Sequence, residues 1–361
     1  MRVLTVNAGS SSVKVALLEE DSNDDTGFRV TQKYGGVDEA LAASAPDVVG
    51  HRVVHGGPRV TTAEPATDEV LGHLEALTPL APLHQPAAIE QVHRTLRVWP
   101  DVPEVVCPDT AFHADQPAAA ATPAVPADWI ERFGLRRYGF HGLSVAWSAR
   151  IVRRAFPDAT RVIVAHLGSG ASLTAVHHGR SVDTTMGYTP LDGLVMATRS
   201  GALDPGMVLE VVRQTEDLDG VVRALETQAG LLGLTGSADM REVLRRRDDG
   251  DPACALGYAV YEHSLRGRLA AMVAALGGLD VLALTGGVGE ASAMVRRSAV
   301  DSLGFIGLCL DEGANHRLDG DHLAADGMAD LTGDGSSARV VVVAAREDVM
   351  IARSAVDVLN G

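Results

Sequence analysis

The sequence predicts an α/β protein built from two related halves. Strand-like apolar runs alternate with helical patterns along the chain, which favours an α/β sheet architecture over a helical bundle. The chain has 361 residues, about the length of two average domains. Most specifically, residues 2–14 align without gaps with residues 161–173, and both segments are typical of a strand, a small-residue turn and a second strand.

The aligned segments carry the same small residues at the turn. Gly9 and Ser10 match Gly168 and Ser169, and each pair is preceded by a polar residue, either Asn7 or His166. Chance is one interpretation, since β-turns favour Gly and Ser. The alternative is a duplicated domain in which each half supplies one phosphate-binding hairpin to a shared cleft.

The remaining elements follow in order along both halves. Further strands are expected at residues 48–54, 104–107, 281–285 and 339–344. Helices are expected at residues 86–98, 143–155, 206–214, 252–276 and 347–359. Residues 116–127 are rich in Ala and Pro and predict a loop, and residues 245–251 predict a solvated turn.

Charge and cysteine content limit the partners and the compartment. The net charge of −16 argues against nucleic acid or an anionic membrane surface as a partner, because both need basic patches. Cys107, Cys254 and Cys309 are widely spaced, so we expect buried thiols in a reducing compartment. With no signal-peptide pattern and only short apolar runs, the sequence predicts a cytoplasmic protein.

Four small-residue turns are candidates for binding phosphate. They lie at residues 9–12, at 168–170, around Gly201 and at 285–290. Backbone N–H groups approach phosphate oxygens closely where no Cβ intervenes. None of the turns has the Walker A spacing, and residues 285–290 lack the dinucleotide-binding spacing. The sequence therefore disfavours both a P-loop nucleotidase and a nicotinamide enzyme.

Charged side chains in short polar clusters suggest anion chemistry. Arg52 and Arg199 could each bind a carboxylate or phosphate through two hydrogen bonds. Phosphoryl transfer depends mainly on positioning and on charge neutralisation by such groups and a metal. Arg52 lies in a Val-rich strand and could instead form a structural ion pair. Asp109, between Pro108 and Thr110, could simply cap a turn.

Eight segments, in order across nearly the whole chain, carry a more specific resemblance. They are VNAGSSSVK, GHRVVHGG, APLHQPAAI, PDTAFH, RRYGFHGLS, AHLGSGASL, MGYTPLDGLVMATRSGALDPG and LTGGVGE. Together they resemble the acetate kinase family, within the superfamily of acetate and sugar kinases, heat-shock chaperones and actin. The resemblance implies a duplicated two-domain actin-like (ribonuclease H-like) α/β fold with a central cleft, and a homodimer. It also implies reversible transfer of the ATP γ-phosphoryl group to acetate, giving acetyl phosphate and ADP.

The resemblance also implies domain limits and residue roles at the reacting end of the site. Residues 1–112 with 346–361 would form domain I, and residues 113–345 domain II, with nucleotide binding and dimerisation. Arg52 and Arg199 would neutralise the carboxylate and the moving phosphoryl group, His141 would donate to it in the transition state, and Asp109 would orient an arginine or assist acid–base chemistry. The implied acetate pocket contains Val54, Leu83, His84, Phe140 and Pro190.

The nucleotide and metal sites are implied in the same way. Asn7 and Glu347 would hold Mg²⁺, with Mn²⁺ as an alternative ion. Ser10, Ser12 and Lys14 would lie at the phosphate turn, and Gly287 would leave room for adenine. The other implied nucleotide-binding residues are His166, Gly168, Ser169, Gly170, Asp239, Met240, Arg241, Val288, Gly289, Glu290 and Ala291.

The chain departs from the family pattern around the nucleotide. Ser169, Ala291 and Arg346 each stand where the family has Asn, and the segment before Arg52 is shortened. We therefore expect altered nucleotide affinity or donor preference with the transfer chemistry retained. A propionate or other short-chain carboxylate kinase is one alternative; a chaperone-like or sugar-kinase-like ATPase of the same superfamily is another.

Overall fold

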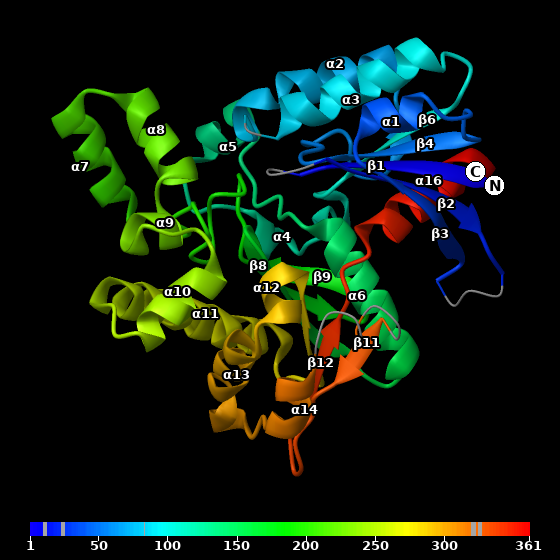
Figure 1. Cartoon of the computed structure of the whole chain (residues 1–361). Coiled ribbons are helices and arrows are strands. Elements are labelled where there is room, and N and C mark those ends of the chain that lie inside the picture. The colour runs from blue at the N-terminus through cyan, green and yellow to red at the C-terminus, as the bar shows by residue number, and fades with distance from the viewer. Residues whose placement is uncertain (10–12, 23–25, 83, 319–322, 324–326) are drawn as a thin grey trace.

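The computed structural model describes residues 1–9, 13–22, 26–82, 84–318, 323 and 327–361 (Figure 1). The chain forms two six-stranded sheets whose strand orders correspond: β3-β2-β1-β4-β6-β5 in the first and β9-β8-β7-β10-β12-β11 in the second. In each sheet three antiparallel strands come first and two strands parallel to the first one follow. The duplication read from the two turns therefore extends to the topology of both halves.

The strand bounds confirm both predicted hairpins and the four further predicted strands. The first sheet contains β1 (Arg2–Ala8), β2 (Val13–Glu20), β3 (Phe28–Tyr34), β4 (Val48–Val53), β5 (Glu64–Pro65) and β6 (Glu104–Pro108). The second contains β7 (Arg161–Leu167), β8 (Ala171–His177), β9 (Arg180–Thr184), β10 (Val281–Thr285), β11 (Met328–Asp330) and β12 (Arg339–Val343). The central parallel strands are almost entirely buried, because helices cover both faces of each sheet.

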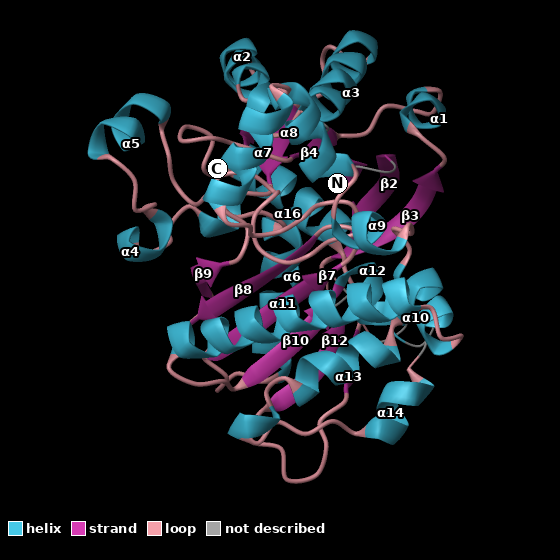
Figure 2. Cartoon of the chain, turned by 90° about the vertical axis from the view of Figure 1, so that its left-hand side faces the viewer, coloured by secondary structure: helices cyan, strands magenta, loops and turns pink. Residues whose placement is uncertain are grey.

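The five predicted helices are present with ends close to those expected. The N-terminal half contains α1 (Val37–Leu41), α2 (Asp68–Ala76), α3 (Gln85–Val98), α4 (Ala118–Ala121), α5 (Ala127–Phe133) and α6 (Gly142–Ala155). The rest contains α7 (Pro205–Thr215), α8 (Leu218–Thr227), α9 (Gly230–Thr235), α10 (Met240–Asp248), α11 (Pro252–Leu276), α12 (Gly286–Ala291), α13 (Ala293–Asp301), α14 (Glu312–Arg317) and α16 (Glu347–Asn360). Short 3₁₀ turns occupy Thr78–Leu80, Ala111–His113 and Gly304–Ile306. Helix α11 lies across the second sheet and contacts β7, β8 and β9 (Figure 2).

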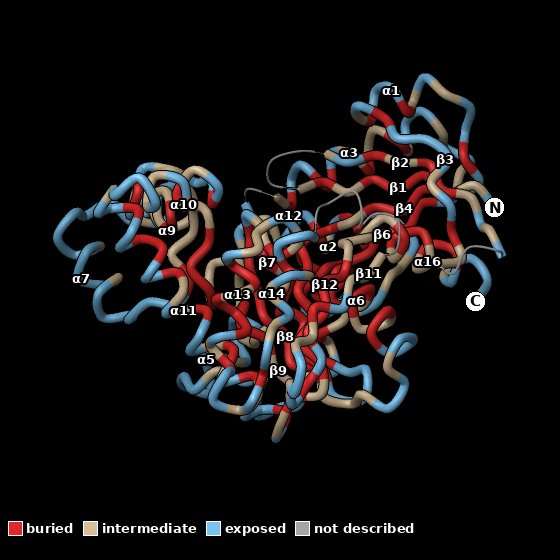
Figure 3. Tube along the Cα trace, turned by 60° about the horizontal axis from the view of Figure 1, so that its bottom comes forward, coloured by how far each residue is buried: buried red, intermediate tan, exposed pale blue. Residues whose placement is uncertain are grey.

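Two helices cross between the halves. Helix α6 follows the first sheet in sequence but packs on β7 and β10, and α16 follows the second sheet but packs on β1, β4 and β6. One apolar core therefore contains residues of both sheets, together with Trp147 and Ile151 from α6 and Ile351 from α16. The buried interior runs along the strands of both halves in Figure 3. Each crossing brings the start of a helix to the region between the sheets.

Three expectations about local structure are wrong. Residues 118–121 of the expected loop form helix α4, which follows Pro117. The expected turn at residues 245–251 is largely the end of α10, where Arg245 pairs with Glu242 and Asp249 one turn away on either side. Cys309 is exposed, whereas Cys107 and Cys254 are buried. Among the described residues, no helix combines the length and the apolar character needed to cross a membrane.

Candidate active site

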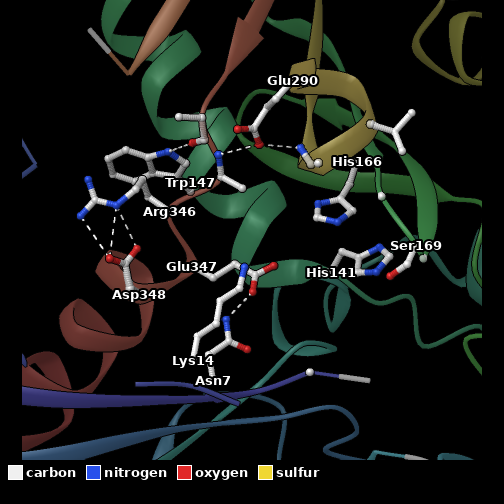
Figure 4. A pocket seen from close by; sticks show the side chains of 18 of the residues that line it. Asn7, Lys14, His141, Trp147, His166, Ser169, Glu290, Arg346, Glu347 and Asp348 are labelled. Atoms are coloured by element: carbon white, nitrogen blue, oxygen red, sulfur yellow. Dashed lines mark hydrogen bonds and ion pairs between the residues drawn. The ribbon is translucent and has the colours of Figure 1, made fainter. Parts of the chain in front are cut away.

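A cavity of about 1880 Å³ lies between the two halves and is lined by residues of both (Figure 4). It brings together most of the predicted site residues: Asn7, Lys14, Arg52, Val54, His84, Asp109, Phe140, His141, His166, Gly168, Ser169, Gly170, Pro190, Arg199, Asp239, Met240, Arg241, Gly287, Val288, Glu290, Ala291 and Glu347. Ser10, Ser12 and Leu83 lie outside the described residues. Gly289 does not line the cavity, and lies against Leu167 and Leu284 instead.

Asn7 and Glu347, from opposite ends of the chain, meet in this cavity. Asn7 is the penultimate residue of β1, and its side-chain amide donates to Oε2 of Glu347 at 2.6 Å. Arg52, its register partner on β4, donates to Oδ1 of Asn7 at 3.3 Å. Burial opposes the Glu347 charge, but Arg52, His166, Asn7 and Lys14 together lower the pKa of this carboxyl. Glu347 is therefore an anion at neutral pH.

Arg52 forms an ion pair and also faces the cavity. Its Nη2 and Nε donate to Oδ2 of Asp109 at 2.5 and 3.0 Å, and its Nη1 donates to the carbonyl of Ala8 at 2.9 Å. Burial opposes the charge, but Asp109 and Glu347 raise the pKa of Arg52. The Arg52 side chain is 11% exposed, and Oδ1 of Asp109 has no hydrogen-bond partner among the described residues. Arg52 therefore forms a structural ion pair with Asp109 and also faces the cavity, where it can bind an anion.

His141 is held in a strained backbone conformation at the start of α6. Its φ of 58° is in the left-handed region, which residues other than glycine adopt uncommonly. Its Nδ1 lies 2.9 Å from Oγ of Ser172, and its ring stacks on that of His166 at 4.2 Å. Burial, followed by the nearby His166 and the two arginines, lowers the pKa of His141 well below its usual value.

The position of the proton on a neutral His141 depends on the direction of its hydrogen bond with Ser172. When the Ser172 hydroxyl donates to Nδ1, Nε2 carries the proton and is free to donate to an anion. His166 has an analogous partner, because its Nδ1 lies 2.8 Å from Oγ of Ser144. Burial is also the main cause that lowers the pKa of His166, against the opposing influence of Glu347.

Arg199 approaches His141 from the second half. Its Nη1 donates to the carbonyl of Pro190 at 2.8 Å. A Cβ added to Gly170 would lie only 2.8 Å from Nη2 of Arg199 and 3.2 Å from Nε2 of His141. Burial lowers the pKa of Arg199 to about 10, so the side chain is still a cation at pH 7. Glycine at position 170 therefore allows the guanidinium and the imidazole to converge.

An apolar wall continues beside these cations. Val54 and Phe140 are 3% and 1% exposed and belong to one buried cluster. His55 supports Phe140 from behind, with ring centroids 5.4 Å apart in an edge-to-face arrangement. Burial, with the charges of Arg199 and Arg52, lowers the pKa of His84 to about 4. The cavity thus offers a small apolar wall next to positive charge.

The far side of the cavity is formed by small residues and a helix cap. A Cβ at Gly287 would meet nothing within 4 Å, so the space above this residue is open. Asp239 caps α10 by accepting from the backbone N–H of Arg241 at 2.9 Å and pairs with its side chain at 2.7 Å. The Ser169 carbonyl accepts from Ala197 N–H at 3.1 Å, while its side chain is exposed in the cavity.

Several supporting residues were not singled out from the sequence. His113 is fully buried, and its ring nitrogens lie 2.9 Å from Oγ of Ser181 and 3.0 Å from the carbonyl of Phe140, just before His141. Ser144 and Ser172 lie within the quoted motifs, each a few positions after a histidine, and this proximity was the signal that could have identified them. Trp147 had no such signal, because its partner, the carbonyl of Ala344, is far away in the sequence.

The duplicated fold brings two cations, neutral imidazoles and a carboxylate into one cleft, a set of groups that suits a phosphotransferase. The family model described as the acetokinase family matches residues 37–353, and the chain belongs to that family. It is 37% identical to the acetate kinase of Clavibacter michiganensis subsp. michiganensis over 400 residues, covering 99% of each chain. The predicted family, actin-like fold class and enzyme class are thereby confirmed.

Solved structures extend this similarity over the whole chain. The crystal structure of Porphyromonas gingivalis acetate kinase has a TM-score of 0.86 and 32% identity, covering 99% of each chain. The structure of a propionate kinase from Francisella tularensis subsp. tularensis has a TM-score of 0.87 and 31% identity, with the same coverage. The backbone similarity is nearly equal for both, so it does not discriminate between the two acids.

Proposed function

We propose that the protein transfers the γ-phosphoryl group of ATP directly and in line to acetate, reversibly, giving acetyl phosphate and ADP. The observation that carries this proposal is the convergence of Arg199 and His141 over Gly170, with Arg52 in the same cavity. A carboxylate is already a nucleophile at pH 7, so the catalytic problem is to bring two anions together. Two arginines solve that problem by charge neutralisation in a protein whose net charge is −16.

Each polar group then has a separate task. Arg52, fixed by Asp109, binds the acetate carboxylate, and Arg199 neutralises the phosphoryl group as it moves. His141 donates from Nε2 to an equatorial oxygen, because Ser172 occupies Nδ1. Asp109 orients Arg52. Oδ1 of Asp109 has no hydrogen-bond partner among the described residues, so Asp109 could also assist acid–base chemistry through this oxygen.

The oxygen donors of Asn7 and Glu347 fit a magnesium ion that arrives with the nucleotide. Mg²⁺ prefers hard oxygen ligands and usually takes only one or two carboxylates, with water and phosphate oxygens completing its shell. Glu347 supplies an ionised carboxylate, and the neighbouring Asn7 would supply an amide oxygen, which accepts from Arg52 in this structure. Bound there, Mg²⁺ would neutralise phosphate charge, and Mn²⁺ is an alternative ion.

We propose acetate as the preferred acid over propionate. Val54 and Phe140 are almost fully buried and leave little depth beside Arg52 for a longer acyl chain. One methylene is worth only about 1–3 kcal/mol of discrimination, so propionate should be a poorer substrate. Because the chain is also similar in backbone structure to a propionate kinase, that activity is the second candidate function.

The nucleotide is proposed to occupy the part of the cavity that Gly287, Ser169 and Asp239 line, with adenine in the open space at Gly287. The phosphates would then extend along Gly168 and Lys14 toward Arg199. Domain I is proposed as residues 1–112 with 346–361, and domain II as residues 113–345. We also propose a cytoplasmic location, because the cysteines are free and far apart.

A homodimer through α7 and α8 is part of the proposal. Neither helix has a buried residue, and α7 lies at the periphery in Figure 3. Leu209, Leu218 and Val222 are 63%, 61% and 43% exposed, an apolar face that a second copy would cover. Light scattering should give twice the chain mass, and Leu218→Asp should give a monomer; a monomeric parent protein would reject this interface.

Trapping of acyl phosphate by hydroxylamine tests the proposed reaction. With acetate, ATP and Mg²⁺ supplied, we expect acetate-dependent hydroxamate and stoichiometric ADP. Propionate in place of acetate should give a lower kcat/KM, and the reverse order would assign a propionate kinase. ADP formation without hydroxamate, unaffected by acetate, would indicate an ATPase of the same superfamily and reject the proposal.

A further inference from the structure

The connection between β12 and α16 is the point at which the chain passes from the second sheet to the first. Two side chains from elsewhere hold its backbone (Figure 4). Nε1 of Trp147 donates to the carbonyl of Ala344 at 2.8 Å, and Oε1 of Glu290 accepts from the N–H of Ala345 at 3.0 Å. Arg346 is paired with Asp348 at 3.0 Å at the start of α16.

Glu290 makes a second contact with the same oxygen. Its Oε1 accepts from the N–H of Gly286 at 2.9 Å, at the first residue of α12. This short helix contains Gly287, Val288 and Ala291, which line the proposed nucleotide site. One carboxylate oxygen therefore joins the nucleotide turn to the crossing.

The turn itself is anchored firmly within the second half. Arg296 on α13 is fully buried and donates to the carbonyls of Gly289 and Glu290 at 3.2 and 2.7 Å. Its remaining hydrogen bonds go to the side chain and the carbonyl of Asn315 at 2.7 and 2.8 Å. Helix α12 thus belongs to the body of the second half, and the Glu290 side chain is its contact with the crossing.

The crossing leads directly to the proposed metal site. Glu347 is the first residue of α16, two positions after Ala345, and its carboxylate accepts from Asn7 of the first sheet at 2.6 Å. A shift of the Ala345 backbone would therefore move Glu347 relative to Asn7 and Arg52. The contacts form an unbroken path from the nucleotide turn to groups of the first half.

We propose that Glu290 is a positioning residue that latches this crossing to the nucleotide turn, so that a nucleotide bound beside α12 sets the position of Glu347. The proposal rests on the proposed function for the location of the nucleotide. Glu290 lines the cavity, and the resemblance implied that it binds the nucleotide; the latch instead assigns its Oε1 to the backbone N–H groups of Gly286 and Ala345. By linkage, a fixed Glu347 strengthens nucleotide binding to the same extent as the nucleotide strengthens the fixed arrangement.

Trp147, at the crossing, provides a fluorescence readout. A purely structural role of Glu290 would not couple this fluorescence to nucleotide binding. The chain has three tryptophans, and the double variant Trp99→Phe, Trp129→Phe leaves Trp147 as the sole one. Because Trp147 is 1% exposed and bonded to Ala344, its fluorescence reports on the crossing. ADP titration in EDTA should change this emission, with ADP binding measured separately by calorimetry.

Glu290→Ala in this background removes the acceptor, and Glu290→Gln keeps an oxygen acceptor without the charge. We expect Glu290→Ala still to bind ADP, with an affinity lower by about tenfold, but to lose the fluorescence change. Its kcat for hydroxamate formation should fall by about tenfold or more. Glu290→Gln should recover the fluorescence change and most of kcat, to within about threefold of the parent protein.

Glu312→Ala is the matched control, because it removes a surface carboxylate paired with Arg297 at 2.7 Å in the same half. It should leave ADP affinity and fluorescence within about twofold. A Glu290→Gln variant as defective as Glu290→Ala would show that the charge acts directly and overturn the latch, as would an unchanged fluorescence response in Glu290→Ala. If the parent protein forms no hydroxamate but Glu290→Ala still loses the ADP response, the proposed function fails and the latch stands.

Discussion

Val54→Ala should shift the preference of the protein from acetate toward propionate. Val54 is 3% exposed and packs in one cluster with Tyr138 and Phe140 beside Arg52. The substitution removes two methyl groups from the wall that is proposed to receive the acetate methyl. The space gained is enough for the one additional methylene of propionate.

The size of the shift follows from the area that each acid buries. Burial of one methylene is worth about 0.8 kcal/mol, which propionate gains in the enlarged pocket. Acetate loses contact with the removed methyls at a cost of about the same size. The two effects add to about 1.6 kcal/mol, so the ratio of kcat/KM for propionate to that for acetate should rise by about tenfold to fifteenfold.

Hydroxamate formation with each acid at saturating ATP measures this ratio. Val53→Ala is the matched control, because Val53 is fully buried on the other face of β4, in a different cluster. It should reduce stability by a similar amount and leave the acid ratio unchanged. An unchanged ratio in Val54→Ala, or the same shift in both variants, would refute the assignment of Val54 to the acyl pocket.

Three further predictions concern charge, nucleotide and pH. Arg199→Ala should lower kcat about a thousandfold at saturating acetate, and near-normal turnover would contradict its role on the moving phosphoryl group. Ser169→Asn with Ala291→Asn should change the ATP and GTP saturation curves; curves identical to those of the parent protein would show that these departures do not tune the nucleotide site. Burial lowers the pKa of His55 and His113 to about 4, so as pH falls the unfolded chain binds protons at these histidines before the folded chain does. The free energy of unfolding should therefore fall as pH drops from about 6.5 to 5, by up to about 1.4 kcal/mol per pH unit for each histidine. An unchanged urea midpoint over that range would contradict this prediction.

Local pattern was enough to predict the elements of the fold but not how they pack. The two hairpins and the amphipathic helix α3 follow from hydrophobic periodicity and turn residues, which act over a few positions. The crossing of α6 and α16 onto the opposite sheets depends on packing between residues far apart in sequence, which periodicity does not encode. The short helix α4 was missed because four alanines between prolines carry no periodic signal.

The residues of the candidate site also fall into those that local sequence pattern identifies and those that it does not. Polar residues that interrupt apolar runs, such as Arg52, Asp109 and His141, were evident from the sequence, and the structure places them in one cavity. His113 and Arg296 were missed because each is bonded to groups that are remote in the sequence or belong to the backbone. Arg296 is buried and bonded to carbonyls and to Asn315, so no oppositely charged residue in the sequence indicates its partner, as one would for an ion pair.

The duplication explains why chemistry collects between the sheets. Helices α6 and α16 occupy equivalent positions, since each follows the last central strand of one sheet and packs on the other. His141 immediately precedes the first residue of α6, Glu347 is the first residue of α16, and both side chains lie in the cavity. The start of a helix carries partial positive charge and unpaired N–H groups, which favours anions there. A fold that crosses its chain twice therefore directs two such helix starts at one space, the cavity in which we propose that the phosphates lie.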